Sequence, residues 1–109
     1  MSNVYNNAVD YGLDVLCIME EPNLNYEFNM FVVWKKPNYD NEPTGSQILY
    51  AVDSGCSCPS PFEDICSVEQ LTRVQNTEEL RSAIKSWGHA DQYEIRRCLS
   101  LVRASVGWI

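Results

Sequence analysis

Three of the five cysteines and the one histidine form the plausible set of residues that could bind a metal or attack a substrate near one loop and one helix end. Cys56 and Cys58 are separated by one serine, Cys66 follows further along, and His89 is the only histidine. Structural zinc is held by four ligands of these types, so the four residues form one candidate zinc set. Paired zinc ligands are normally separated by two or more residues, and the remaining spacings here are irregular. The spacing therefore does not favour a metal, and the zinc site is kept as an alternative.

The same thiols would act as nucleophiles only beside a base that activates them and a third group that orients the base. His89 follows Gly88, which is expected to end a helix, and this position is more typical of a solvated linker than of a catalytic base. The sequence contains no phosphate-binding glycine loop, paired-histidine metal motif, nucleophile elbow or dinucleotide-binding fingerprint. We therefore expect a protein that is not an enzyme and uses no cofactor. A thiol-dependent module centred on Cys56, Cys58 and Cys66 is the alternative.

Glycine and proline restrict the backbone around the paired cysteines. Gly55 admits conformations closed to other residues, while Pro59 and Pro61 fix their own φ angles and push the residues before them away from helix. A stiff loop of this kind presents thiols to a metal, displays a binding surface, or turns the chain tightly from a sheet towards helices. We favour a binding surface, formed by an interaction loop of Gly55, Cys56, Ser57, Cys58, Pro59, Pro61 and Phe62.

The pattern of apolar residues predicts an α+β fold. Alternation predicts an antiparallel meander of three strands at about residues 12–20, 26–36 and 47–53. After the cysteine-proline loop, helical periodicity behind capping residues predicts two C-terminal helices at about residues 77–87 and 92–105. Strands followed by helices are typical of a sheet with the helices packed on one face.

Length, composition and charge restrict the class of protein. The chain has 109 residues, of which 45% are hydrophobic, and this is enough for one core. Residues 1–10 are polar and rich in asparagine, so we expect a flexible N-terminus before a single α+β domain at residues 11–109. The formal net charge of −7 repels phosphate backbones, and nucleic acid is not expected as a partner. No apolar run approaches the roughly 18 residues that cross a bilayer, so a membrane is not expected either.

The second face of the predicted sheet needs a cover. If the helices cover one face, the other presents an apolar patch, and large patches on soluble domains usually mark interfaces. The N-terminus, the C-terminal tail at residues 106–109, a second copy or a different protein could cover it, so homodimerisation is left open. The patch, a candidate sheet-face interface, is predicted to consist of Leu16, Ile18, Phe31, Val33 and Leu49.

The loop also carries a resemblance. The sequence YAVDSGCSCPSPFED at residues 50–64, followed by Leu-Thr-Arg at residues 71–73, resembles a group of small uncharacterised proteins encoded by bacteriophages of actinobacteria. The resemblance is specific in the loop and looser from residue 11 to the region of residue 80. It implies a viral accessory protein that works in the host cytoplasm, and it implies no particular functional residues. We therefore expect a non-enzymatic protein that acts by contact with a host protein.

Overall fold

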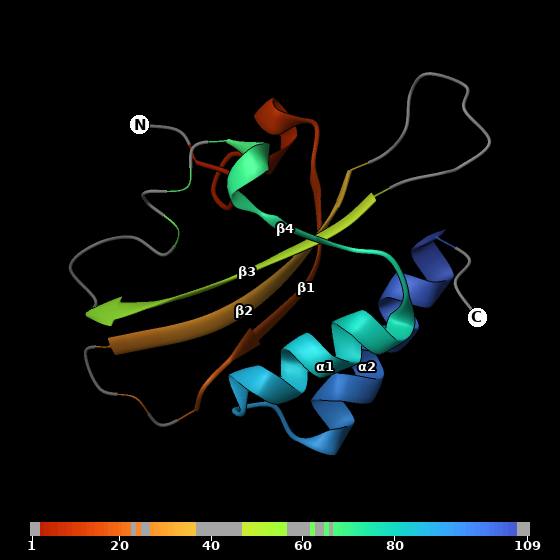
Figure 1. The fold of residues 1–109 in the computed structure, drawn as a ribbon. Helices are drawn as coiled ribbons and strands as arrows, with labels where there is room; N and C mark the ends of the chain where they lie inside the picture. Colours follow the sequence, from red (N-terminus) through yellow and green to blue (C-terminus); the bar gives the residue numbers. More distant parts are fainter. Residues whose placement is uncertain are drawn as a thin grey trace.

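The computed structural model describes residues 3–22, 24, 27–36, 47–56, 62, 65 and 67–106. In these residues a four-stranded antiparallel sheet lies between a pair of helices and a second layer of short segments (Figure 1). The strands are β1 (Asp14–Glu20), β2 (Glu27–Lys36), β3 (Gln47–Cys56) and β4 (Thr72–Val74), in the order β1-β2-β3-β4. The other elements are the helices α1 (Thr77–Trp87) and α2 (Gln92–Val106) and the 3-10 turns η1 (Ala8–Tyr11) and η2 (Val68–Gln70).

The predicted α+β architecture is confirmed, including the antiparallel sheet and the two C-terminal helices. The prediction of three strands is wrong, because β4 pairs with β3 opposite Ile48, Leu49 and Tyr50. A strand of three residues is too short for its alternation to stand out from a loop. β3 also runs beyond its predicted end at residue 53, so Gly55 and Cys56 belong to the sheet.

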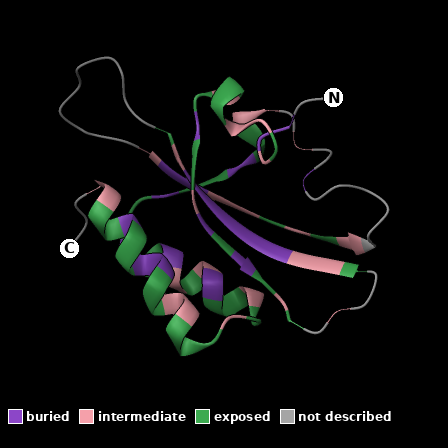
Figure 2. Cartoon of the chain, turned by 180° about the vertical axis from the view of Figure 1, so that it is seen from behind, coloured by how far each residue is buried: buried purple, intermediate pink, exposed green. Residues whose placement is uncertain are grey.

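The two helices cover one face of the sheet. Each helix buries one stripe at helical spacing: Leu80 and Ile84 from α1, and Cys98, Leu99 and Val102 from α2. Figure 2 shows the buried positions of both helices turned towards the sheet. The sheet contributes Cys17, Met19, Phe31, Val33, Ile48 and Val74 to this helix-side cluster.

The opposite face is covered by the chain's own N-terminal residues and by the segment before β4. Val4 and Leu13 are buried there against a cluster that contains Trp34. The indole Nε1 of Trp34 donates a hydrogen bond to the Val4 carbonyl at 3.0 Å, and the Val4 N–H donates to the Ile65 carbonyl at 3.1 Å. In Figure 1, η1 and η2 accordingly lie on the side of the sheet away from the helices.

A side-chain turn gives the N-terminal residues their local structure. The Oδ1 atom of Asn3 accepts hydrogen bonds from the backbone N–H groups of Tyr5 at 2.9 Å and Asn6 at 2.7 Å, and Asn3 itself is buried. Asparagine favours turns for this reason. The sequence predicts a flexible segment at residues 1–10, whereas Val4, Tyr5 and Ala8 of this segment pack into the second layer.

A bulge in β1 changes which side chains share a face. The register between β1 and β2 shifts between Val15 and Cys17. One extra residue in a strand reverses the alternation that follows it. Leu16 and Cys17 therefore both belong to the helix side, while Ile18 pairs with Val32 on the opposite face.

The predicted sheet-face interface is consequently wrong as a single exposed patch. Phe31 and Val33 are fully buried under the helices, and Leu16 is half-buried beside them. Leu49 is buried in the opposite layer, and Ile18 alone of the five is exposed, at 37%. Alternation identifies two faces but does not say which one the helices cover, and the bulge then divides the β1 members between them.

Among the described residues, no helix combines the length and the apolar character needed to cross a membrane.

Candidate functional site

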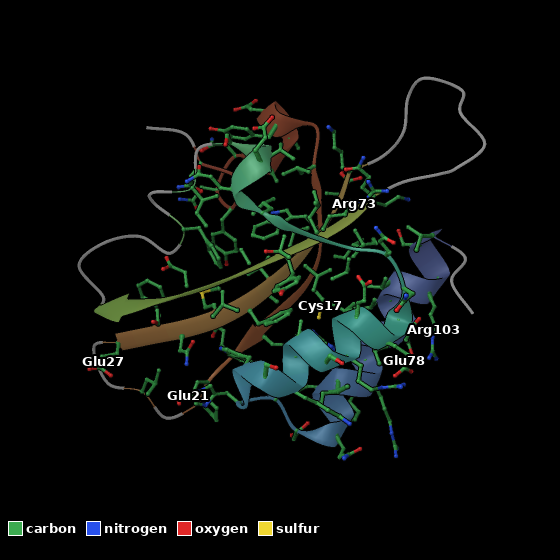
Figure 3. All side chains as sticks on the ribbon, in the orientation of Figure 1. Cys17, Glu21, Glu27, Arg73, Glu78 and Arg103 are labelled. Atoms are coloured by element: carbon green, nitrogen blue, oxygen red, sulfur yellow. The ribbon has the colours of Figure 1, made fainter. Side chains whose placement is uncertain are left out.

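An open groove of about 910 Å³ lies between the edge of the sheet and α1. Its walls come from β3, β4 and α1, elements that the chain brings together only by folding. We call it the β3–α1 groove and define it by Tyr50, Val52, Arg73, Glu79, Ser82 and Trp87. Figure 3 shows Arg73 on β4 and Glu78, another lining residue, near the start of α1.

The floor of the groove is aromatic and held in place from below. Phe31 in the helix-side cluster stacks on Tyr50, with ring centroids 5.0 Å apart and planes 3° apart. The same ring contacts Trp87 at 5.8 Å, tilted by 52°. The Nε1 atom of Trp87 donates a hydrogen bond to Asn29 Oδ1 at 2.9 Å. Because these contacts fix both half-buried rings, a ligand would meet a preorganised surface.

One wall of the groove is acidic. Asn76 caps α1 by accepting a hydrogen bond from the Glu79 N–H at 2.9 Å, and Glu79 Oε2 accepts one from the Gln75 N–H at 2.9 Å. Carboxylates are favoured in a first helical turn because the free N–H groups there carry partial positive charge. Glu78 lies beside Glu79 and pairs with Arg81. The local reasons that start the helix therefore also place two carboxylates on the wall of the groove.

The predicted interaction loop lies partly outside the described residues. Ser57, Cys58, Pro59 and Pro61 are in that part, and Gly55 and Cys56 end β3. Phe62 is fully buried, and its ring contacts Trp34 edge to face at 5.5 Å and Tyr5 at 5.4 Å. The expectation that Phe62 lies on an exposed contact surface is therefore wrong: its side chain fills the core of the second layer.

Asp53 joins β3 to the end of the cysteine-proline loop. Its Oδ2 atom accepts a hydrogen bond from the Phe62 N–H at 2.7 Å, and its Oδ1 atom accepts one from the Ser54 N–H at 3.0 Å. Phe62 has a positive φ of 62°, an uncommon conformation for a residue with a side chain. The Asp53 bond and the burial of the ring together hold this conformation.

The model of a domain of unknown function, DUF7574, matches residues 2–107. The chain is a member of the DUF7574 family. No curated protein and no solved structure matches it.

The candidate zinc ligands of this DUF7574 chain are only partly described. Cys58 and Cys66 lie outside the described residues. His89 Nδ1 lies 2.9 Å from Glu21 Oε1, and its ring meets Trp87 edge to face at 5.3 Å. In the part of the chain that the structure describes, no three His, Cys, Asp or Glu residues are grouped to hold a metal. The zinc-binding or thiol-dependent module centred on Cys56, Cys58 and Cys66 stays a prediction.

Two other cysteines meet inside the domain. Cys17 on β1 and Cys98 on α2 are buried free thiols of the helix-side cluster, and Figure 3 shows Cys17 between the sheet and the helices. A hydrogen bond with the Cys98 thiol lowers the pKa of Cys17 to about 7, although burial opposes this shift. The same bond, followed by burial, raises the pKa of Cys98. The pair joins α2 to the sheet as part of the core.

The β3–α1 groove was not predicted from the sequence. Tyr50 and Val52 were visible as one face of a predicted strand, and Trp87 as the last residue of a helical stripe. The groove could not be predicted because the sequence revealed neither the strand β4 nor which face of the sheet lies under α1. The signal that could have helped is the apolar Val74 between the polar Arg73 and Gln75, which is consistent with a short strand.

Proposed function

We propose that the protein is a small non-enzymatic domain that acts by binding another protein, and that the β3–α1 groove receives this partner. The observation that carries the proposal is the position of the groove: it opens beside the part of β3 that lies beyond its pairing with β4. A concave surface with an accessible strand next to it is a common arrangement in peptide-binding domains.

The chemistry of the groove supports the same function. Tyr50 and Trp87 offer aromatic surface, and Val52 beside them is 44% exposed. Aromatic residues are enriched among the side chains that carry binding energy at protein interfaces. Hydroxyl groups of α1, including Ser82, and the carboxylate of Glu79 supply polar contacts at the wall. The lining thus combines an apolar floor with a polar rim, as protein interfaces do.

The expected biological setting is part of the proposal. The likeness of residues 50–64 to proteins of actinobacterial bacteriophages supports a host protein as the partner and the host cytoplasm as the place of action. Residues 57–61 of the predicted interaction loop are proposed as a further part of the contact surface. A homodimer would use the same surface for a second copy.

Affinity capture with a matched pair of variants tests the proposal. Ser82→Arg introduces a long charged side chain into the groove, and Ser100→Arg introduces the same side chain at an exposed position of α2 outside it. The wild type and Ser100→Arg should retain the same proteins from an actinobacterial lysate, and Ser82→Arg should lose them. Circular dichroism and thermal unfolding check that both variants fold. Equal retention by all three proteins would contradict the proposal.

A further inference from the structure

The outer edge of β3 is longer than the strand that pairs with it. β3 has ten residues, and β2 pairs with all of them from Gln47 to Cys56. On the other side, β4 pairs only opposite Ile48 to Tyr50. Within the described residues, the stretch from Ala51 onwards therefore has a paired strand on the β2 side alone.

The hydrogen-bonding direction of this stretch follows from β2. The N–H of Glu21, the residue that follows β1, donates a hydrogen bond to the Asn29 carbonyl at 2.9 Å. The N–H and carbonyl groups of Asn29 therefore point towards β1. Backbone groups alternate in direction along a strand, so Met30 points towards β3, where its partner is Asp53. Val52 and Ser54, on either side of Asp53, then point away from β2.

Within the part of the chain that the structure describes, this edge of β3 therefore offers main-chain groups to another strand. Val52 presents an N–H and a carbonyl, and Ser54 presents a carbonyl, because the Ser54 N–H donates to Asp53 Oδ1. These groups continue the line of bonds that β4 makes with Ile48 and Tyr50. Unpaired strand edges bind extended segments readily, and proteins normally cover or blunt them.

The β3–α1 groove lies where side chains of such a strand would go. Val52 and Tyr50 share a sheet face with Phe31, the face under α1, and both line the groove. A strand added at the edge would direct every second side chain to this face. Those side chains would meet the aromatic floor and then Ser82 on the wall of α1.

The charge of the domain limits which kind of partner can bind in the β3–α1 groove. The chain carries 15 acidic and 8 basic residues, for a net charge of −7, so a second copy would be repelled. Glu78, Glu79 and Arg73 line the groove, and Glu78 is paired with Arg81. A partner strand with lysine or arginine among its side chains would be attracted by Glu79 and by the net negative charge of the whole domain.

From these observations we infer that the partner binds by strand addition: an extended segment with alternating apolar and basic residues pairs with the outer edge of β3 and fills the groove. This inference rests on the proposed interaction function and adds the binding mode and the chemistry of the partner.

A displayed library of short random peptides is the probe, selected against the whole domain. Selected peptides should alternate apolar residues with lysine or arginine, and Ser82→Arg should weaken their binding. The edge is tested by Val52→Pro, which removes the outward N–H while leaving the bonds to β2 in place, against Val52→Thr, which keeps it. Loss of this one main-chain hydrogen bond should weaken binding about threefold to tenfold for the proline variant only.

A second test uses the wild-type domain, so it does not depend on the proline variant folding. Two versions of a selected peptide carry N-methyl groups on alternate residues, one version on each edge of the extended strand. Strand addition predicts that one version binds about tenfold more weakly than the other, because only one edge faces β3. Equal affinities of the two versions would overturn the inference.

The remaining outcomes separate the inference from the proposed function. If Ser82→Arg weakens peptide binding but Val52→Pro and methylation of the peptide leave the affinity unchanged, strand addition is overturned. The proposed interaction function is not affected by that result. Selected peptides that are acidic would overturn the basic partner. A dimer that Val52→Pro abolishes in sedimentation would assign the edge to a second copy and overturn the inference. Absence of selected peptides, together with unchanged protein capture by Ser82→Arg, would overturn both proposals.

Discussion

Replacement of Phe62 by alanine tests whether this residue belongs to the core or to a contact surface. Phe62 is fully buried, with its ring against Trp34 and Tyr5. Deleting a buried phenylalanine ring removes its transfer free energy and leaves a cavity, which together cost about 3–5 kcal/mol. The backbone strain at φ 62° is the same for alanine and does not alter this difference.

The expected loss is large against the total stability of a small domain, which is about 5–15 kcal/mol. A urea dependence of about 2 kcal/mol per molar converts the loss into a downward shift of the midpoint by about 2 M. Equilibrium unfolding in urea, followed by tryptophan fluorescence, measures it because Trp34 contacts the deleted ring.

Tyr93→Ala is the matched control. Tyr93 is an aromatic residue of α2 that is 75% exposed, so its removal should change the free energy of unfolding by less than about 0.5 kcal/mol. Phe62→Leu keeps most of the apolar volume and should fall between the two. A Phe62→Ala variant within about 1 kcal/mol of the wild type would refute the assignment of Phe62 to the core.

Two further predictions concern the helices. Asn76→Ala removes the side chain that caps α1 and should lower the free energy of unfolding by about 1 kcal/mol. Asn76→Asp keeps a hydrogen-bond acceptor at this position and should keep most of the stability. Equal losses of the two variants in urea unfolding would contradict the capping role of Asn76. The pKa of Cys17 falls from 9.0 to about 7 on folding, so the free energy of unfolding should rise between pH 7 and pH 9. The pKa of Cys98 is raised on folding, so the free energy of unfolding should decline again above pH 9. Cys98→Ala should remove both trends in reducing buffer, and a pH profile that this variant leaves unchanged would contradict the thiol pair.

The elements that could be predicted are those with a long repeat or a local signal. β2 has ten residues of alternation, and α1 has a cap, a stripe and a final Gly88 in the left-handed conformation, with φ 81°. Such signals depend on neighbours in the chain, so the sequence contains them in full. β4 and the layer formed by residues 3–13 depend on contacts with distant residues, and the local pattern around Val74 is too short to predict a strand by itself.

The candidate site shows the same division. The loop around Gly55 was prominent because its residue types are unusual, but residue type does not reveal burial, and Phe62 proved to be part of the core. The bulge at Leu16 likewise has no marker in the sequence. The β3–α1 groove exists only where three separate elements meet, and its residues are individually ordinary.

The open edge of β3 has a cause in the path of the chain. Leu71 is buried in the layer opposite the helices, and Val74, three residues later, is buried under them. The segment between them must therefore pass the edge of the sheet from one layer to the other, as Figure 1 shows for β4.

Pairing along this path is restricted to the crossing itself. Before it, η2 takes up backbone groups that could have extended the ladder, because the Gln70 N–H donates to the Ser67 carbonyl at 3.2 Å and the Leu71 N–H to the Val68 carbonyl at 3.0 Å. After it, Asn76 begins α1. β4 cannot lengthen towards Val52 without unfolding η2 and withdrawing Leu71 from its cluster. Among the described residues, the edge of β3 beyond Tyr50 thus stays unpaired because both layers are covered by the same chain, and this ties the proposed binding surface to the fold.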